Sequence, residues 1–303
     1  METIIGVDVG NGLTKTVHTE FTSAVKDYGE TKPSIMDKTV MFEGHYYTVG
    51  GKRSKTKTDQ KEEGDMTAFI LTLAGIGEEL KARNIKDTDV VLSEGLPLER
   101  CIEENIVFDE KYYRKGETLY FEYEDIPHTI FMKEVFVNPQ CISAVIDTFS
   151  RGLLPPICLL IDIGSWTVDI VPMIDGKPRG SEAHSLIGVG IINCMLSCNE
   201  EVRRRTGREV MEEQIQQIMR GKKNVLPPRF ETVITESIKK YIKDLCDTLY
   251  EHSYNIDTVT CIIMGGGATV VRNFGGECFP IAKYITDIRA NAIGFEKLAK
   301  GRI

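Results

Sequence analysis

Two segments of the chain share a pattern in which an apolar strand ends at an aspartate and a glycine turn follows. Asp162 comes after a run of five apolar residues and precedes Gly164, beyond which an extended pattern resumes. Asp8 comes after a second apolar run and precedes Gly10. Such runs are typical of strands buried on both faces. Each segment therefore predicts a hairpin with an aspartate at its strand end and outward-facing amides in its turn.

The predicted turns suit a polyphosphate, because backbone N–H groups bind phosphate oxygens and Lys15 adds a point charge. The candidate phosphate-binding residues besides Lys15 are Gly10, Asn11, Gly12, Leu13, Gly164, Ser165, Trp166 and Thr167. Asp8 and Asp162 suit a hydrated magnesium ion. An ordinary tight turn would also explain either hairpin alone. Two copies about 150 residues apart favour two similar halves that face a common cleft.

A third glycine-rich feature lies near the end of the chain. The apolar strand 262–264 leads directly into Gly265, Gly266 and Gly267, ahead of a short helix-like stretch. Three residues without side chains allow a flat purine or a ribose to pack on bare backbone. A triple glycine alone would be weak evidence for a nucleotide site. It supports such a site here because the two predicted phosphate-binding hairpins precede it.

These motifs resemble those of a known superfamily of ATPases. Segments 8–15, 162–169 and 265–267 are similar, in order and spacing, to the first phosphate, second phosphate and adenosine motifs of actin, sugar kinases and heat-shock chaperones. Segments 95–97 and 137–140 resemble the bacterial actin-like proteins, above all the ParM-type filaments that segregate plasmids. The resemblance implies an α/β, actin-like two-domain fold. Each domain would be a mixed β-sheet flanked by helices, with ATP or GTP and Mg2+ in the interdomain cleft.

The resemblance also implies catalytic roles. Gln140 matches the Gln or Glu that orients the attacking water, and a neutral amide can both donate to and accept from water. Pro139 permits a helix start there, which predicts that Gln140 lies in a first helical turn. Asp169, on the same side as Thr167, matches a residue that helps hold this water. A surface glutamine and a core-rim aspartate remain the structural alternatives.

The glycines of the segment 188–190 precede a predicted helix that begins at Ile191. Gly188 is a candidate nucleotide contact, because a residue without a side chain lets a phosphate or ribose approach a helix start. Turn glycines without a ligand explain the segment almost as well.

The predicted organisation is two domains. Residues 1–153 would form domain I, with an inserted small subdomain over about 31–95, and the C-terminal helix 286–303 would pack back on it. Residues 154–285 would form domain II.

Within domain I, the pattern over 31–50 predicts a small inserted sheet. The basic segment 51–61 predicts a solvated loop. The actin-like resemblance implies the alternative that this loop contacts a neighbouring subunit or partner. Residues 66–83 predict a helix with its apolar residues on one face.

Composition narrows the class of protein. The chain has 303 residues, a net charge of -8 and no apolar run near the ~20 residues that cross a bilayer, so we expect a cytoplasmic protein without a membrane partner. The negative charge argues against direct nucleic-acid binding. The eight cysteines contain no Cys-x-x-Cys pair, which favours buried thiols over a metal site.

The resulting hypothesis is a filament-forming, Mg-dependent ATPase. By its ParM-type resemblance it would polymerise with copies of itself and segregate plasmid or other DNA through a DNA-binding adaptor protein, with hydrolysis timing disassembly. The alternative is a small-molecule kinase of the same superfamily, acting on a sugar or acetate. Such a kinase needs a general base near the acceptor hydroxyl, normally an aspartate, where this chain offers Gln140.

Overall fold

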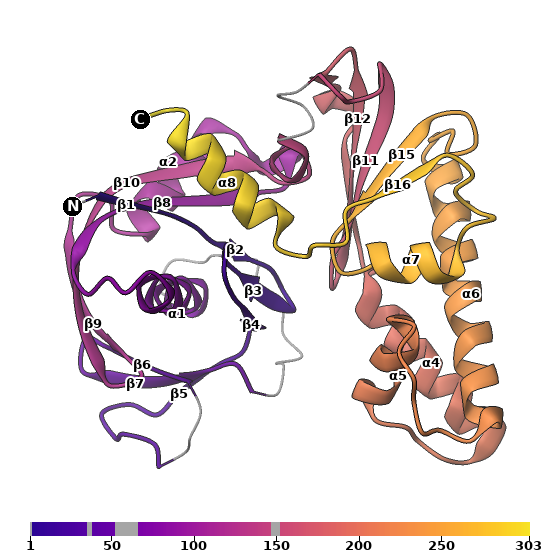
Figure 1. Cartoon of the computed structure of the whole chain (residues 1–303), viewed down its shortest axis with the longest axis horizontal. Coiled ribbons are helices and arrows are strands. Elements are labelled where there is room, and N and C mark those ends of the chain that lie inside the picture. The colour runs from indigo at the N-terminus through magenta and orange to yellow at the C-terminus, as the bar shows by residue number, and fades with distance from the viewer. Residues whose placement is uncertain (1, 35–37, 52–65, 147–151) are drawn as a thin grey trace. The chain divides into compact units, whose positions relative to one another are not determined.

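The computed structural model describes residues 2–34, 38–51, 66–146 and 152–303. The chain divides into two compact units (Figure 1). Unit 1 consists of Met1–Ser150 together with Arg289–Ile303, and unit 2 consists of Arg151–Ile288. Unit 1 therefore contains both ends of the chain.

Unit 1 is built on a seven-stranded mixed sheet in the order β1-β8-β10-β9-β6-β7-β5 and a three-stranded sheet β2-β3-β4. In the larger sheet, β8 pairs in parallel with β1 and β10, and the other pairs are antiparallel. The strands are β1 (Glu2–Gly6), β2 (Asp8–Val9), β3 (Leu13–Lys15), β4 (Glu20–Thr22), β5 (Val25–Asp27), β6 (Lys38–Phe42), β7 (His45–Val49), β8 (Thr88–Leu96), β9 (Thr118–Tyr123) and β10 (Ile126–Pro139). The helices are α1 (Thr67–Ala82), α2 (Glu103–Tyr112) and α8 (Ala290–Lys300), with the 3-10 turns η1 (Leu98–Arg100) and η2 (Ser143–Val145).

The predicted hairpin within residues 31–50 is present as β6 and β7. Its turn residues Glu43 and Gly44 have φ angles of 51° and 82°, a left-handed pair that closes a tight hairpin. The prediction of a separate small sheet is wrong, because β6 pairs with β9 and so extends the seven-stranded sheet. Residues 52–61 of the predicted basic loop lie outside the described residues.

The helix predicted over 66–83 is confirmed as α1. Its apolar residues Phe69, Leu73, Ile76 and Leu80 are buried as expected. Burial is not confined to one face, because every residue from 68 to 77 is buried. Figure 1 shows α1 end-on with strands of both sheets around it, so this helix forms the centre of the unit 1 core.

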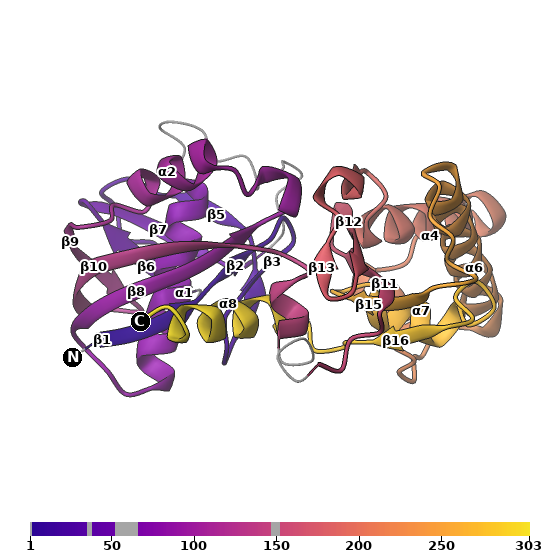
Figure 2. The ribbon, with the colours of Figure 1, turned by 90° about the horizontal axis from the view of Figure 1, so that it is seen from above.

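The helix α8 lies beside β1 and β8 (Figure 2), and glycines at three positions allow its close packing. A Cβ atom at Gly6 would lie 2.1 Å from the carbonyl oxygen of Ala292, and one at Gly95 would lie 2.1 Å from the Phe295 ring. A Cβ at Gly294 would lie 1.9 Å from the Ser143 carbonyl oxygen in η2. The C-terminal helix therefore belongs to unit 1, and it begins at Ala290.

Unit 2 has a six-stranded mixed sheet with the path β13-β12-β11-β15-β16, and β14 pairs with β12. Its strands are β11 (Ile157–Ile163), β12 (Thr167–Ile174), β13 (Lys177–Pro178), β14 (His184–Ile187), β15 (Thr260–Met264) and β16 (Ala282–Tyr284). Its helices are α4 (Ile191–Thr206), α5 (Glu212–Met219), α6 (Pro228–Glu251) and α7 (Ala268–Phe274), with the turn η3 (Gly180–Glu182). Apolar side chains from β11, β15, α4 and α6 share one core.

No helix in the described part of the chain is both long and apolar enough to cross a bilayer. Six of the eight cysteines are buried, and all eight are free thiols. Among the described residues, no group of three or more His, Cys, Asp or Glu side chains is arranged to hold a metal ion.

Candidate functional site

The first predicted hairpin consists of β2 and β3. Asp8 pairs across the strands with Lys15, and the Gly10 amide donates to the Leu13 carbonyl oxygen at 3.1 Å. A Cβ at Gly10 would also lie 3.1 Å from that oxygen, tighter than ordinary van der Waals contact. A residue without a side chain thus allows this close turn.

Asp8 connects the side chains predicted to act in unit 1. It is 2% exposed, and its Oδ2 accepts a charged hydrogen bond from Lys15 Nζ at 2.8 Å. Its Oδ1 accepts from Gln140 Nε2 at 3.2 Å. A buried carboxylate is stable in this place because a cation pairs with it and an amide donates to it. The structure thus brings together three residues that are as much as 132 positions apart.

Gln140 does not lie in a first helical turn, so the helix predicted to start at Pro139 is wrong. Pro139 is the last residue of β10, and the amide of Gln140 donates to the Leu96 carbonyl oxygen at 2.8 Å. Cys141 then has a left-handed φ of 65°, which a right-handed helix cannot accommodate. Its amide donates to Asn291 Oδ1 at 3.2 Å, so α8 fixes the turn that carries Gln140.

The second hairpin, made by β11 and β12, repeats the geometry of the first. The Gly164 amide donates to the Thr167 carbonyl oxygen at 2.9 Å, and a Cβ at Gly164 would lie 3.2 Å from it. Asp162 pairs across the strands with Asp169. Corresponding residues of the two hairpins are each 154 positions apart. The pairs are Asp8 and Asp162, Gly10 and Gly164, Leu13 and Thr167, and Lys15 and Asp169.

One difference between the two hairpins changes the charge of the site, because Asp169 in unit 2 stands where unit 1 has Lys15. Asp162 and Asp169 are 8% and 7% exposed and lie opposite each other on neighbouring strands. Thr167 Oγ1 donates to Asp169 Oδ2 at 3.3 Å, as expected for residues on the same side of a strand. Two buried carboxylates so placed repel each other, and a bound cation would offset that repulsion.

The N-terminus of α4 docks on the second turn. The amides of Ile191 and Ile192 donate to the carbonyl oxygens of Gly164 and Ser165, each at 3.0 Å. A Cβ at Gly190 would lie 2.5 Å from the Ser165 carbonyl oxygen, so this glycine permits the docking. Sequence analysis missed this role of Gly190.

Gly188 is the exposed member of the same segment. It has a left-handed φ of 82°, and its amide donates to the Trp166 carbonyl oxygen at 2.9 Å. This contact alone would account for a glycine at position 188.

The triple glycine lies directly beside Asp162. Gly265 has a φ of 79°, and a Cβ there would lie 2.1 Å from Asp162 Oδ1. A Cβ at Gly267 would lie 2.2 Å from Ile163 Cγ2, and the Gly267 amide donates to the Ile163 carbonyl oxygen at 2.9 Å. Gly266 is exposed, and a Cβ there would approach nothing closer than 4.0 Å. Two of the three glycines are therefore required by packing on β11.

Comparisons with known proteins relate this arrangement to solved structures. No family model matches the chain, and no curated protein matches it. The archaeal actin homolog Ta0583 in complex with ADP superposes with a TM-score of 0.77 at 20% identity, over 98% of this chain and 99% of that chain.

ParM proteins superpose as well. The apo pSK41 ParM protein gives a TM-score of 0.71 at 17% identity, over 99% of this chain and 98% of that one. The subunit of a 15-stranded ParM filament from Clostridium botulinum gives 0.73 at 19% identity, over 99% and 100%. The chain therefore has the actin-like fold, which confirms the fold class predicted from its motifs.

Proposed function

We propose that this chain is a Mg-dependent ATPase that assembles into filaments with copies of itself. The observation that carries the proposal is the repeated hairpin, in which Asp8 and Asp162 precede glycine turns closed by the same amide-to-carbonyl bond. It supports phosphate binding, because such turns place backbone N–H groups where an anion can accept from them. The ADP bound to the structurally similar Ta0583 adds support.

Phosphate groups would be bound at the glycine turns of the hairpins. Lys15 would supply the positive charge, and backbone amides of the two turns would donate to phosphate oxygens. The residues proposed to contact the nucleotide are Gly10, Asn11, Gly12, Leu13, Gly164, Ser165, Trp166, Thr167 and Gly188. The amides of Gly10, Gly164 and Gly188 already donate within the protein, so these glycines would instead allow close approach of the ligand.

The acidic residues fit a magnesium ion held through its waters. Asp8 and Asp162 offer carboxylate oxygens, which hard cations prefer. The ion would neutralise the charge that develops on the transferred phosphoryl group. Asp162 and Asp169 together supply negative charge that suits a cation.

The attacking water would be oriented by Gln140. The hydrogen bond from its Nε2 to Asp8 fixes the amide plane, so that Oε1 can accept from a water O–H. Asp169 is the second candidate to order this water or accept its proton.

The base and ribose would pack on the triple glycine. Gly266 is the member with open space above it, whereas Gly265 and Gly267 contact β11. Backbone without side chains accepts the flat face of a purine, which suits ATP or GTP alike.

Filament disassembly would be the output of hydrolysis. Loss of the terminal phosphate removes contacts to both hairpins, which shifts the protein towards a form with weaker contacts to neighbouring subunits. The solved ParM filament of the same fold supports self-assembly. A DNA-binding adaptor would connect such filaments to plasmid or other DNA, since the net charge of -8 disfavours direct contact. The proposed location is the cytoplasm.

Light scattering and phosphate release test this function together. With ATP and magnesium at micromolar protein, scattering should rise and then decay as phosphate accumulates. A flat trace with every nucleotide would contradict filament formation. Turnover that appears only when a sugar or acetate is added, with a phosphorylated product, would instead establish the kinase.

A further inference from the structure

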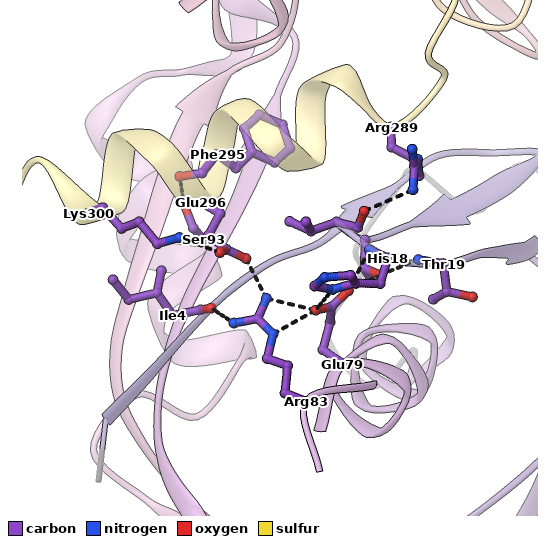
Figure 3. A network of polar contacts seen from close by, with 12 residues as sticks. Ile4, His18, Thr19, Glu79, Arg83, Ser93, Arg289, Phe295, Glu296 and Lys300 are labelled. Carbon is purple, nitrogen blue, oxygen red and sulfur yellow. Dashed lines mark hydrogen bonds and ion pairs between the residues drawn. The ribbon is translucent and has the colours of Figure 1, made fainter. Parts of the chain in front are cut away.

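A buried polar network in unit 1 is centred on Glu79 of α1 (Figure 3). Glu79 is fully buried, yet its two carboxylate oxygens accept five hydrogen bonds. The donors are Thr16 Oγ1 at 2.5 Å, the His18 amide at 2.9 Å, His18 Nδ1 at 2.7 Å, Arg83 Nε at 2.9 Å and Arg83 Nη2 at 2.7 Å. A carboxylate so buried is retained only where its oxygens are this fully bonded.

The segment that Glu79 holds begins immediately after Lys15. Thr16 and Thr19 close a tight turn, with the Thr16 amide donating to the Thr19 carbonyl oxygen at 2.9 Å. Because β3 has only three residues, Lys15 lies between two fixed points, Asp8 on one side and the Glu79-bound turn on the other. A lysine side chain is flexible, so the position of its ammonium group depends on how firmly the backbone is fixed.

The network continues to the C-terminal helix through Arg83. Its Nη1 donates to the Ile4 carbonyl oxygen of β1 at 2.8 Å, and its Nη2 donates to Glu296 Oε2 of α8 at 2.7 Å. Lys300 in turn donates to Glu296 Oε1 at 2.7 Å. Arg289, at the start of α8, donates to the Val17 carbonyl oxygen at 3.0 Å, within the same turn that Glu79 binds (Figure 3).

The same helix fixes the turn of Gln140. Asn291 accepts from the Cys141 amide, and Gly294 packs on Ser143. Lys15 and Gln140 both contact Asp8, and the backbone segments that carry them are both held by the network that includes α8.

We propose that Glu79 is a positioning residue for phosphoryl transfer, which acts by holding the Lys15 backbone in register with Asp8 and Gln140. This inference rests on the proposed ATPase function. Glu79 touches none of the three groups itself, so its effect on turnover passes through the segment 16–18.

The test is a Glu79→Gln variant, which keeps the shape of the side chain but places an amide NH2 where a carboxylate oxygen now accepts from donors. ATP turnover is measured with magnesium at a protein concentration below the onset of scattering, on samples whose folded fraction is checked by circular dichroism. We expect kcat to fall by roughly ten- to a hundredfold, as misplacement of a catalytic group does, with a much smaller change in KM.

A double-mutant cycle with Lys15→Met separates positioning from a structural role. If Glu79 acts through Lys15, Glu79→Gln lowers kcat little further once Lys15 is gone. If the two losses simply multiply, or if the lost activity equals the lost folded fraction, the inference is wrong. The matched control is Lys81→Gln, which removes an exposed ion pair with Glu124 from the same helix and should leave kcat at the parent value.

The two proposals fail in different ways. A parent protein that hydrolyses no nucleoside triphosphate contradicts the ATPase and with it this inference. An active parent whose folded Glu79→Gln variant keeps kcat within about twofold contradicts the inference alone.

Discussion

At the scale of residues, three side chains define the proposed chemistry of unit 1. Lys15 and Gln140 each contact Asp8 within 3.2 Å, although Gln140 lies 132 positions from Asp8. Their types and order were predicted from the sequence. Their direct contacts were not, because a turn after a strand can aim a glutamine in several directions. The left-handed φ of Cys141 and the bond from its amide to Asn291 fix the direction here.

The first residue-scale prediction concerns water orientation. Gln140→Ala should slow ATP hydrolysis by about a hundredfold, because a group that orients water acts on the transition state. Nucleotide affinity, measured by fluorescence titration, should change by less than about threefold, and filaments should persist longer in the scattering assay. Hydrolysis at the parent rate would remove Gln140 from its proposed role.

A second prediction separates the glycines that packing requires from the one it does not. Gly265→Ala should lower the free energy of unfolding by about 1–3 kcal/mol, because its φ of 79° is left-handed and the new Cβ would meet Asp162 Oδ1. Gly266→Ala should leave stability nearly unchanged in the same urea titrations. Equal stability of the two variants would mean that this packing is not maintained in solution.

A third prediction follows from the pKa of Glu79. Burial raises the pKa of this carboxyl, but the hydrogen bonds from Thr16, His18 and Arg83 outweigh burial, so the folded pKa lies below the usual value. A carboxyl with a lowered folded pKa contributes stability above the unfolded pKa of about 4.3 and loses that contribution as pH falls through the folded value.

The stability difference between the parent and Glu79→Gln should therefore be largest near neutral pH and should shrink in acid. Urea unfolding of both proteins from pH 7 to pH 3 measures it. A difference that stays constant over this range would show that the charge of Glu79 does not stabilise the fold.

At the scale of elements, the apolar patterns predicted local structure correctly. The helix over 66–83 and the hairpin within 31–50 are present, because periodicity and turn residues encode local structure. Pairing partners are not local. The sheet that β6 joins is set by β9, about 80 residues further along the chain, so the sequence could not separate an inserted sheet from an extension of the main one.

The network around Glu79 was also missed for a physical reason. An acidic residue between Ile76 and Leu80 in an apolar helix was its only signal, and such a residue usually lies on a solvated face. Here α1 is enclosed by strands, so the residue must be buried and bonded instead.

The element-scale prediction concerns the docking of α8. Gly294→Ala should destabilise unit 1, because the new Cβ would lie 1.9 Å from the Ser143 carbonyl oxygen. Overpacking of this kind costs about 1–3 kcal/mol, and the helical preference for alanine recovers about 1 kcal/mol of it. Gly301→Ala, at the end of the same helix and with more space, is the control in urea unfolding. A variant as stable as the parent would contradict the tight contact.

At the scale of the whole molecule, two units carry one hairpin each at a constant shift of 154 positions. A ligand that binds these turns stabilises only the folded chain. ATP with magnesium at a hundredfold excess over its Kd should therefore raise the free energy of unfolding by about 2.7 kcal/mol.

Removing magnesium with a chelator should abolish most of that gain, and Asp162→Ala should abolish its magnesium-dependent part along with hydrolysis. Differential scanning fluorimetry with and without the chelator measures both effects. A nucleotide gain that is insensitive to the chelator would argue against the proposed metal role of Asp162.

The position of α8 also affects how the chain can fold during synthesis. Unit 1 contains the first 150 residues but is completed only by Arg289–Ile303. Unit 2 is synthesised in full before the glycine surfaces at Gly6 and Gly95 receive their helix. Most of unit 1 is thus synthesised before unit 2 but completed after it, and loss of Arg289–Ile303 would destabilise unit 1 more than unit 2.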